Sequence, residues 1–215
     1  MAITFDNASS VQTLAAPGSL SLPLLIAGDY LFVVVGSDDV TPAAPSGVKY
    51  NGVAMSPLFS IIGSLISLTG WGLVAPAAGL HNIVATFPSP QRDVAMGGTS
   101  WIGVHPTAPV GMANTATGNS ATPSVDIASV VGDIVVDGVY AMQTPIVIGP
   151  GQANRWKEEA IVGDSVFSGA SSSEVAISSL TTMSWTIPSG FWSMGGITLK
   201  AATIGGQQLM GGIVM

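Results

Sequence analysis

A tight β-hairpin is encoded by VKYNGVAMSP, residues 48–57. Asn51 and Gly52 stand at its centre, and apolar residues alternate on both sides, with Tyr50 before the turn and Val53 after it. A two-residue type I′ turn needs positive φ at both central positions, and Asn-Gly accepts that conformation readily. The segment therefore predicts two short antiparallel strands joined by a tight turn.

The rest of the 215-residue chain repeats this spacing of short apolar runs and turn residues. Residues 30–35, YLFVVV, are rich in β-branched and aromatic side chains, which favours a central strand over a helix. Roughly a dozen such segments occur, with turn signals about every 8–12 residues. Residues 106–123, rich in Pro, Thr, Asn and Gly, are predicted as a loop. The expected fold class is all-β: an antiparallel β-sandwich, jelly-roll-like, with an extended apolar C-terminal tail.

A short motif occurs twice. Gly28-Asp29 precedes YLFVVV, and Gly132-Asp133 precedes IVVDGVY. Two equivalent corners of one sandwich explain this echo as well as a duplication does. Because sandwiches of about 200–250 residues often form one domain, we predict a single β-sandwich domain over residues 1–201, followed by a C-terminal arm at 202–215.

Charged side chains are scarce. The chain has 5 Lys and Arg against 12 Asp and Glu, a net charge of −7, and charged residues make up 8% of it. A typical soluble domain has about 25%. A surface of Ser, Thr, Gly, Asn and small apolar groups is poorly protected against association. We therefore expect a protein that is assembled, as a homo-oligomer or with other subunits; the alternative is a monomer with a Ser- and Thr-rich surface.

The composition also argues against several partners and chemistries. Nucleic acid needs a basic footprint, and the chain has no cluster of Lys or Arg. No run approaches about 18 apolar residues, so no membrane span is expected, and the first ten residues lack the features of an export signal. The absence of cysteine removes thiolate catalysis and cysteine zinc sites.

Residues able to carry catalysis are few. His81 and His105 are the only histidines, and neither lies in an HExxH or GxSxG context. The adjacent acids at 38–39 suit turn capping better than a cation site, since no EF-hand spacing surrounds them. The adjacent acids at 158–159 are more apt to point apart than into one cleft. We predict no enzyme activity, no cofactor and no metal site.

Trp156 differs from the other four tryptophans, which lie beside apolar neighbours in predicted strands and are expected in the core. It is flanked by Arg155 and Lys157 in the charge-dense segment 152–160, QANRWKEEA, which is predicted as a short helix or a loop. Trp and Arg are enriched at the energetic centres of interfaces. We therefore predict that Trp156 and Arg155 contact a partner; local packing beneath a loop is the alternative.

The C-terminal arm contains an apolar sequence. Residues 205–215, GGQQLMGGIVM, lie beyond the last predicted strand. A free apolar segment lowers solubility, so we expect it to be covered, either by its own domain or by strand addition to a neighbouring subunit. The interface residues predicted in this arm are Leu209, Met210, Ile213, Val214 and Met215.

Four segments in this order, GDYLFVVV, VKYNGVAMSP, WGLVAPAAGLHNIVATF and SWTIPSGFWSMGGITLK, resemble a β-sandwich module of phage virion proteins and bacterial surface proteins. The module has a jelly-roll or concanavalin-like shape, and the resemblance spans about residues 19–201. Standing alone, it implies a structural virion protein, most specifically a capsid decoration (cement) protein that contacts the major capsid protein or other virion subunits. The alternative is a glycan- or receptor-binding module of a tail fibre or cell-surface protein, with Trp156 as its exposed aromatic platform.

Overall fold

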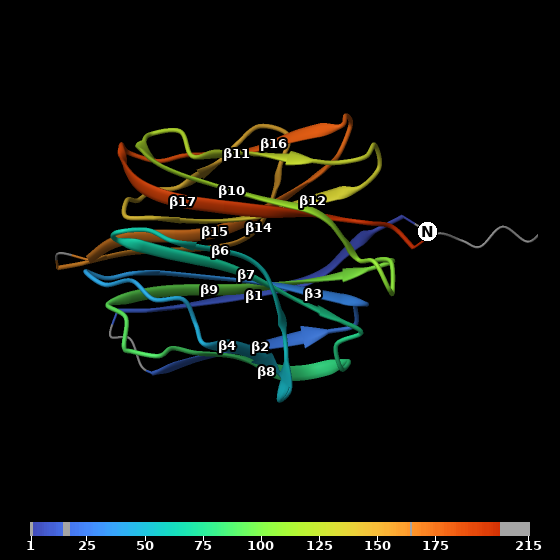
Figure 1. The fold of residues 1–215 in the computed structure, drawn as a ribbon, viewed down its shortest axis with the longest axis horizontal. Helices are drawn as coiled ribbons and strands as arrows, with labels where there is room; N and C mark the ends of the chain where they lie inside the picture. Colours follow the sequence, from blue (N-terminus) through green and yellow to red (C-terminus); the bar gives the residue numbers. More distant parts are fainter. Residues whose placement is uncertain (1, 15–17, 164, 203–215) are drawn as a thin grey trace, which may run out of the picture.

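The computed structural model describes residues 2–14, 18–163 and 165–202, and the regular elements in these ranges are β-strands. The strands form four sheets that lie one above the other as four layers (Figure 1). Neighbouring strands pair in antiparallel fashion throughout. The predicted all-β antiparallel sandwich is therefore confirmed. In these ranges no helix is long and apolar enough to span a membrane.

The N-terminal half builds the two lower layers of Figure 1 from β1 (Thr4–Thr13), β2 (Ser19–Ile26), β3 (Tyr30–Asp38), β4 (Gly47–Tyr50), β5 (Val53–Ala54), β6 (Ser56–Ile62), β7 (Ile66–Val74), β8 (Gly79–Thr86) and β9 (Asp93–Ile102). The C-terminal half builds the two upper layers from β10 (Val110–Ser120), β11 (Ser124–Ala128), β12 (Ile134–Ala141), β13 (Val147–Ile148), β14 (Ala153–Val162), β15 (Ser165–Val175), β16 (Leu180–Thr186) and β17 (Gly190–Leu199).

Each half is a sandwich of one inner and one outer sheet. In the N-terminal half the inner sheet has the order β1-β9-β3-β7-β6 and the outer sheet β2-β8-β4-β5. In the C-terminal half the orders are β10-β17-β12-β15-β14 and β11-β16-β13. The chain passes back and forth between the two sheets of each half, which is the strand order of a jelly roll. The two inner sheets face each other in the middle of the molecule (Figure 1).

The two halves repeat one topology. Strand β10 takes the place of β1, β12 that of β3, and β17 that of β9. The corners Gly28-Asp29 and Gly132-Asp133 lead into the central strands β3 and β12. Met-Gly-Gly sequences at 96–98 and 194–196 also occupy corresponding positions in β9 and β17. The echo therefore marks corresponding corners of two sandwiches. That both unfold together, as a single domain over 1–201 requires, stays a prediction.

Three buried cores hold the four layers together. One lies inside each sandwich, and the third lies between the two inner sheets. This central core takes large side chains from both halves: Phe32, Phe59 and Trp101 from the first, and Tyr140, Trp156 and Phe167 from the second. The halves are thus joined by a continuous apolar interface.

Glycines let the inner sheets approach each other where large side chains cross the central core. A Cβ atom built on Gly97 would lie 2.2 Å from the Trp156 ring, and one built on Gly36 would lie 2.5 Å from the Tyr140 ring. Real Cβ atoms essentially never approach other atoms closer than 3.0 Å. The missing side chain of each glycine therefore leaves the space that an aromatic ring of the other half occupies.

Gly97→Ala is expected to lower the free energy of unfolding by about 1–3 kcal/mol, because the added methyl group overlaps a ring fixed in a packed core. Gly47→Ala is the matched control, since a Cβ there meets nothing within 4 Å. The control should stay within about 0.5 kcal/mol of the wild type. Urea denaturation measures both, and equal midpoints for Gly97→Ala and the wild type would contradict the packing described.

Candidate functional site

Arg155 and Trp156 lie on β14, an edge strand of the inner sheet of the C-terminal half. The segment 152–160 is therefore neither a helix nor a loop, because it pairs with β15 in a hairpin. Trp156 is only 5% exposed, so the expectation of an exposed ring is wrong. Strand alternation turns Trp156 toward the central core, where its ring packs against Gly97, and leaves Lys157 exposed.

Arg155 joins the two halves along the same edge. Its guanidinium carbon lies 4.3 Å from the ring centroid of Phe5 and 5.3 Å from that of Trp101. Its Nε donates a hydrogen bond to the Ser173 hydroxyl at 2.8 Å. Burial lowers the pKa of Arg155. Cation–π contacts of this kind contribute about 0.5–2 kcal/mol, so Arg155 has a role within the chain, and its contact with another molecule stays a prediction.

The other predicted interface residues lie outside the described residues, and their role stays a prediction: Leu209, Met210, Ile213, Val214 and Met215. The described chain ends at Ala202, whose N–H donates a hydrogen bond to the carbonyl of Gly103 at 2.9 Å. The arm therefore begins beside the loop that follows β9.

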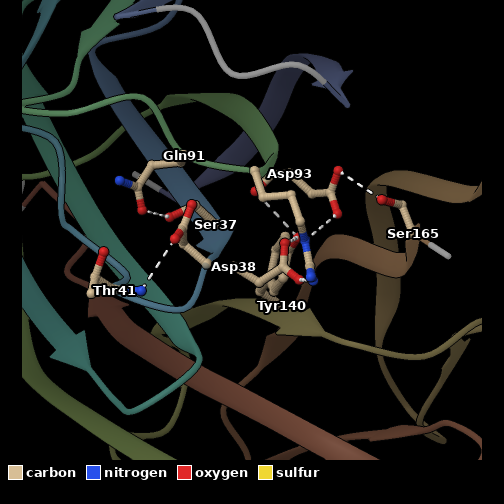
Figure 2. Close-up of polar contacts among 9 residues, drawn as sticks. Ser37, Asp38, Thr41, Gln91, Asp93, Tyr140 and Ser165 are labelled. Carbon is tan, nitrogen blue, oxygen red and sulfur yellow. Dashed lines mark hydrogen bonds and ion pairs between the residues drawn. The ribbon is translucent and has the colours of Figure 1, made fainter.

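A buried polar cluster connects the two halves at one end of the central core (Figure 2). Asp38 ends β3 and pairs across the strands with Asp93, which begins β9, and both carboxylates are buried. Arg92 forms ion pairs with both. Tyr140 of the C-terminal half donates its hydroxyl to Asp38 Oδ1 at 3.0 Å, and Ser165 donates to Asp93 Oδ1 at 3.3 Å.

The electrostatics of this cluster suit a structural connection. Burial raises the pKa of Asp38, and the hydrogen bond from Tyr140 and the charge of Arg92 counteract that rise. Burial and the nearby Asp38 carboxylate raise the pKa of Tyr140 well above its usual value. Tyr140 therefore remains a hydrogen-bond donor to Asp38. In the described ranges no group of three or more His, Asp or Glu is placed to hold a metal ion.

The remaining candidates for chemistry stabilise loops. Asp39 accepts a hydrogen bond from the N–H of Thr41 at 3.1 Å, which is the turn capping predicted for residues 38–39. For Asp38 that prediction is wrong, because its carboxylate is buried at the end of β3. His105 Nδ1 accepts from the N–H of Ala108 at 3.1 Å, in the loop that precedes β10. His81 lies edge-on to the buried ring of Tyr50, with ring centroids 5.7 Å apart. The side chains of Asp39, His105 and His81 therefore each make a contact that stabilises the structure around them.

A second buried acid lies inside the sandwich of the C-terminal half. Asp137 of β12 accepts hydrogen bonds from the N–H and hydroxyl of Ser172, at 2.6 and 2.9 Å, and from Trp185 Nε1 at 2.8 Å. Gln152 extends this network from the Ser172 hydroxyl to the N–H of Ser184. Burial raises the pKa of Asp137 to about 7, although these donors favour the carboxylate. The fold thus contains a protonation site near neutral pH.

An exposed apolar surface lies at one end of the C-terminal half. The loop 129–133, between β11 and β12, runs beside the loop 176–179, between β15 and β16. The N–H of Ser129 donates to the carbonyl of Ser179 at 3.1 Å, and the N–H of Gly132 to that of Ala176 at 2.9 Å. We name this surface the end patch; its large apolar side chains, each more than half exposed, are Val130, Val131, Val175, Ile177 and Leu180.

The fold itself does not require large apolar residues at these turns. The corresponding loops of the N-terminal half contain only small residues, AGD at 27–29 and APAA at 75–78. Asp133 is the charged residue in the loops of the end patch, and its carboxylate accepts a hydrogen bond from the N–H of Val130 at 3.1 Å.

Interpretation of the sequence missed the end patch. The available signal was the pair of valines directly before the Gly132-Asp133 turn, together with Ile177 in a turn otherwise made of Ala and Ser. Turn positions favour polar residues and glycine, so large aliphatic residues there indicate a role other than forming the turn.

Comparisons with known proteins identify no family. No family model matches the chain, and no curated protein matches it. The crystal structure of the major capsid protein P2 from bacteriophage PM2 aligns with a TM-score of 0.26 at 9% identity, over 93% of this chain and 99% of that chain. A structure of red clover necrotic mosaic virus aligns with a TM-score of 0.23 at 8% identity, over 94% of this chain and 81% of that chain. The chain thus weakly resembles solved viral structures, a likeness that carries no argument about function.

Proposed function

We propose that the protein is a structural subunit of a virion, most specifically a capsid decoration protein that stabilises a phage shell through contacts with neighbouring subunits. The observation that carries this proposal is the end patch, in which large aliphatic side chains stand exposed on two loops and on the strand ends beside one of them, and backbone hydrogen bonds hold the two loops together. Single exposed apolar residues are ordinary, but a group of them on adjoining ordered loops is typical of a contact surface.

The composition supports the same function. With 8% charged residues and a net charge of −7, the surface has few charges that oppose association with another protein. The proposed partners are the major capsid protein or other virion subunits, including further copies of this chain, and the proposed location is the virion. Jelly-roll order alone decides nothing here, because the same order occurs in viral capsid domains and in lectins.

The alternative of a glycan- or receptor-binding module rested on Trp156 as an exposed aromatic platform. The ring of Trp156 is buried in the central core, so it does not supply that platform. We therefore favour the structural function. Specific binding of the wild-type protein on a glycan array would reverse that preference.

Ile177→Asp is expected to weaken association by at least about tenfold. Burying one large aliphatic side chain contributes about 1.5–3 kcal/mol, and each 1.4 kcal/mol corresponds to about a factor of ten. Ile177 is 81% exposed, so the substitution should leave the fold intact. Sedimentation velocity over a concentration series measures self-association, and co-sedimentation with empty phage capsids measures binding to a shell.

Val147→Asp is the matched control for this experiment, because Val147 is also more than half exposed but lies on β13, outside the end patch. The control should associate as the wild type does. Association of Ile177→Asp at the wild-type level, or a wild-type protein that is monomeric and ignores capsids, would contradict the proposed function.

A further inference from the structure

The two inner sheets meet along two long sides of the molecule, and one side is closed by polar contacts. There β1 lies beside β14: the Ser10 hydroxyl donates to Glu158 Oε1 at 2.7 Å, and Gln12 Nε2 donates to the carbonyl of Glu159 at 3.3 Å. Arg155 adds its contact with Phe5 on the same side. In the repeated topology β10 corresponds to β1 and β6 to β14, so β10 and β6 form the equivalent boundary on the opposite side.

The boundary between β6 and β10, which we name the open seam, lacks such contacts. In the part of the chain that the structure describes, no hydrogen bond or ion pair joins these two strands. Neither SPLFSII of β6 nor VGMANTATGNS of β10 contains a charged residue. Ile62 and Met112 are exposed along it. Edge strands are usually protected by charged side chains, so this pair of edges is unusually open to another strand.

Two cavities lie at the two ends of the open seam, and a further cavity, described first, adjoins one of them. The first, of about 470 Å³, is lined by Val74, Val104 and Ala202 among others. The second, of about 410 Å³, also includes Val74 and lies at the beginning of both strands, with Leu58 and Val110 in its wall. The third, of about 340 Å³, lies at the far end of both strands, where Leu65, Phe191 and Trp192 line it. Adjoining cavities therefore lead from Ala202 to the beginning of the seam, and a separate cavity lies at its far end.

We propose that residues 203–215 of the same chain bind along the open seam. The segment follows Ala202, which lines the first cavity. Its 13 residues reach up to about 45 Å when extended, whereas the strand β10 is about 37 Å long. The segment is therefore long enough to reach the third cavity.

The chemistry of the segment matches the seam. TIGGQQLMGGIVM contains no charged side chain, and its apolar residues can cover the cavities while its backbone adds to an unpaired edge. Attachment at Ala202 favours the chain's own segment over a neighbour's, because a short linker gives an effective concentration of millimolar order. This inference does not depend on the end patch or on the proposed function.

Disulfide trapping tests the proposal directly, because the chain has no cysteine of its own. Leu209→Cys is combined with Met112→Cys in the seam, and in a control with Val147→Cys on the outer strand β13. Under mild oxidation the seam pair should form an intramolecular disulfide at least about tenfold faster than the control pair. Equal rates would overturn the proposal, and disulfide-linked dimers of the seam pair would overturn it in favour of a neighbour's segment.

Hydrogen exchange supplies a second test, which does not require two cysteines to lie in the geometry of a disulfide bond. In a chain ending at Ala202, amides of β6 and β10 should exchange at least about tenfold faster than in the full chain, whereas amides of the closed edge β1 should be unchanged. Equal protection of β6 and β10 in both chains would overturn the proposal. Because both measurements are made within one chain, they can fail while the Ile177→Asp experiment succeeds, and the reverse also holds.

Discussion

Trp156→Ala is expected to lower the free energy of unfolding by about 3–5 kcal/mol, the range found when large aromatic side chains are removed from cores. The ring crosses the central core from β14 and lies against Gly97 of β9 and Gly169 of β15. Glycines have no side chain that could move into the vacated volume, so the cavity cannot collapse easily. The loss falls on the interface between the two halves rather than within one sandwich.

Urea denaturation followed by circular dichroism measures the effect, and Lys157→Ala is the matched control. Lys157 is the next residue on β14, and its side chain is exposed. Its replacement by Ala removes only the ion pair with Glu159 at 3.1 Å. Exposed pairs contribute about 0–1 kcal/mol. A Trp156→Ala protein as stable as the control would show that the central core does not hold the halves together. Coincident unfolding of both halves would support the single domain predicted over 1–201.

Stability is expected to fall as pH rises from about 4 to about 7, because of Asp137. Burial raises the folded-state pKa of Asp137 to about 7, against an ordinary value of 3.8. Between these values the folded chain retains a proton that the unfolded chain has lost, so the stabilisation is complete below the lower value and disappears as pH rises through the higher one. The difference between the two pKa values corresponds to about 4 kcal/mol as an order of magnitude.

The comparison of Asp137→Asn with Asp126→Asn isolates this effect. Asp137→Asn places an amide N–H opposite the N–H of Trp185, so two hydrogen-bond donors face each other and stability should fall at every pH. The same substitution should remove much of the pH dependence. Asp126 is an exposed acid on β11 that accepts a hydrogen bond from Thr182, and its replacement should leave the dependence intact. Denaturant titrations at several pH values above the isoelectric point measure the slopes. Equal slopes for wild type and Asp137→Asn would refute the assignment.

Two of the segments that were assigned incorrectly from the sequence are edge strands. Residues 152–160 were interpreted as a helix or loop because charges dominate them, yet they form β14. Residues 106–123 were interpreted as a loop because they are polar and small, yet β10 spans Val110–Ser120. An edge strand has one unpaired side and is partly solvated, so its composition resembles that of a loop. Only its pairing partner, distant in sequence, identifies it.

The contacts of Arg155 and Trp156 within the chain could not be predicted, for a related reason. Both residues are of types enriched at interfaces, and both contact the other half of the same chain. Their contact with a partner stays a prediction. Composition identifies a side chain suited to a contact. It does not distinguish a contact between two halves of one chain from a contact between two chains.

The sequence by itself determined the local structure of the tight hairpin and of the central strand. Asn51 and Gly52 adopt φ of 48° and 78°, as the predicted turn requires, and residues 30–35 form a fully buried central strand. These features depend on backbone preferences and on apolar spacing within a few residues. The tertiary structure alone decided that two sandwiches share a central core, that Trp156 is inside it, and that Val131 and Ile177 stand outside. Those placements depend on pairings between residues about 100 positions apart, such as Gly36 with Tyr140, which no local pattern encodes.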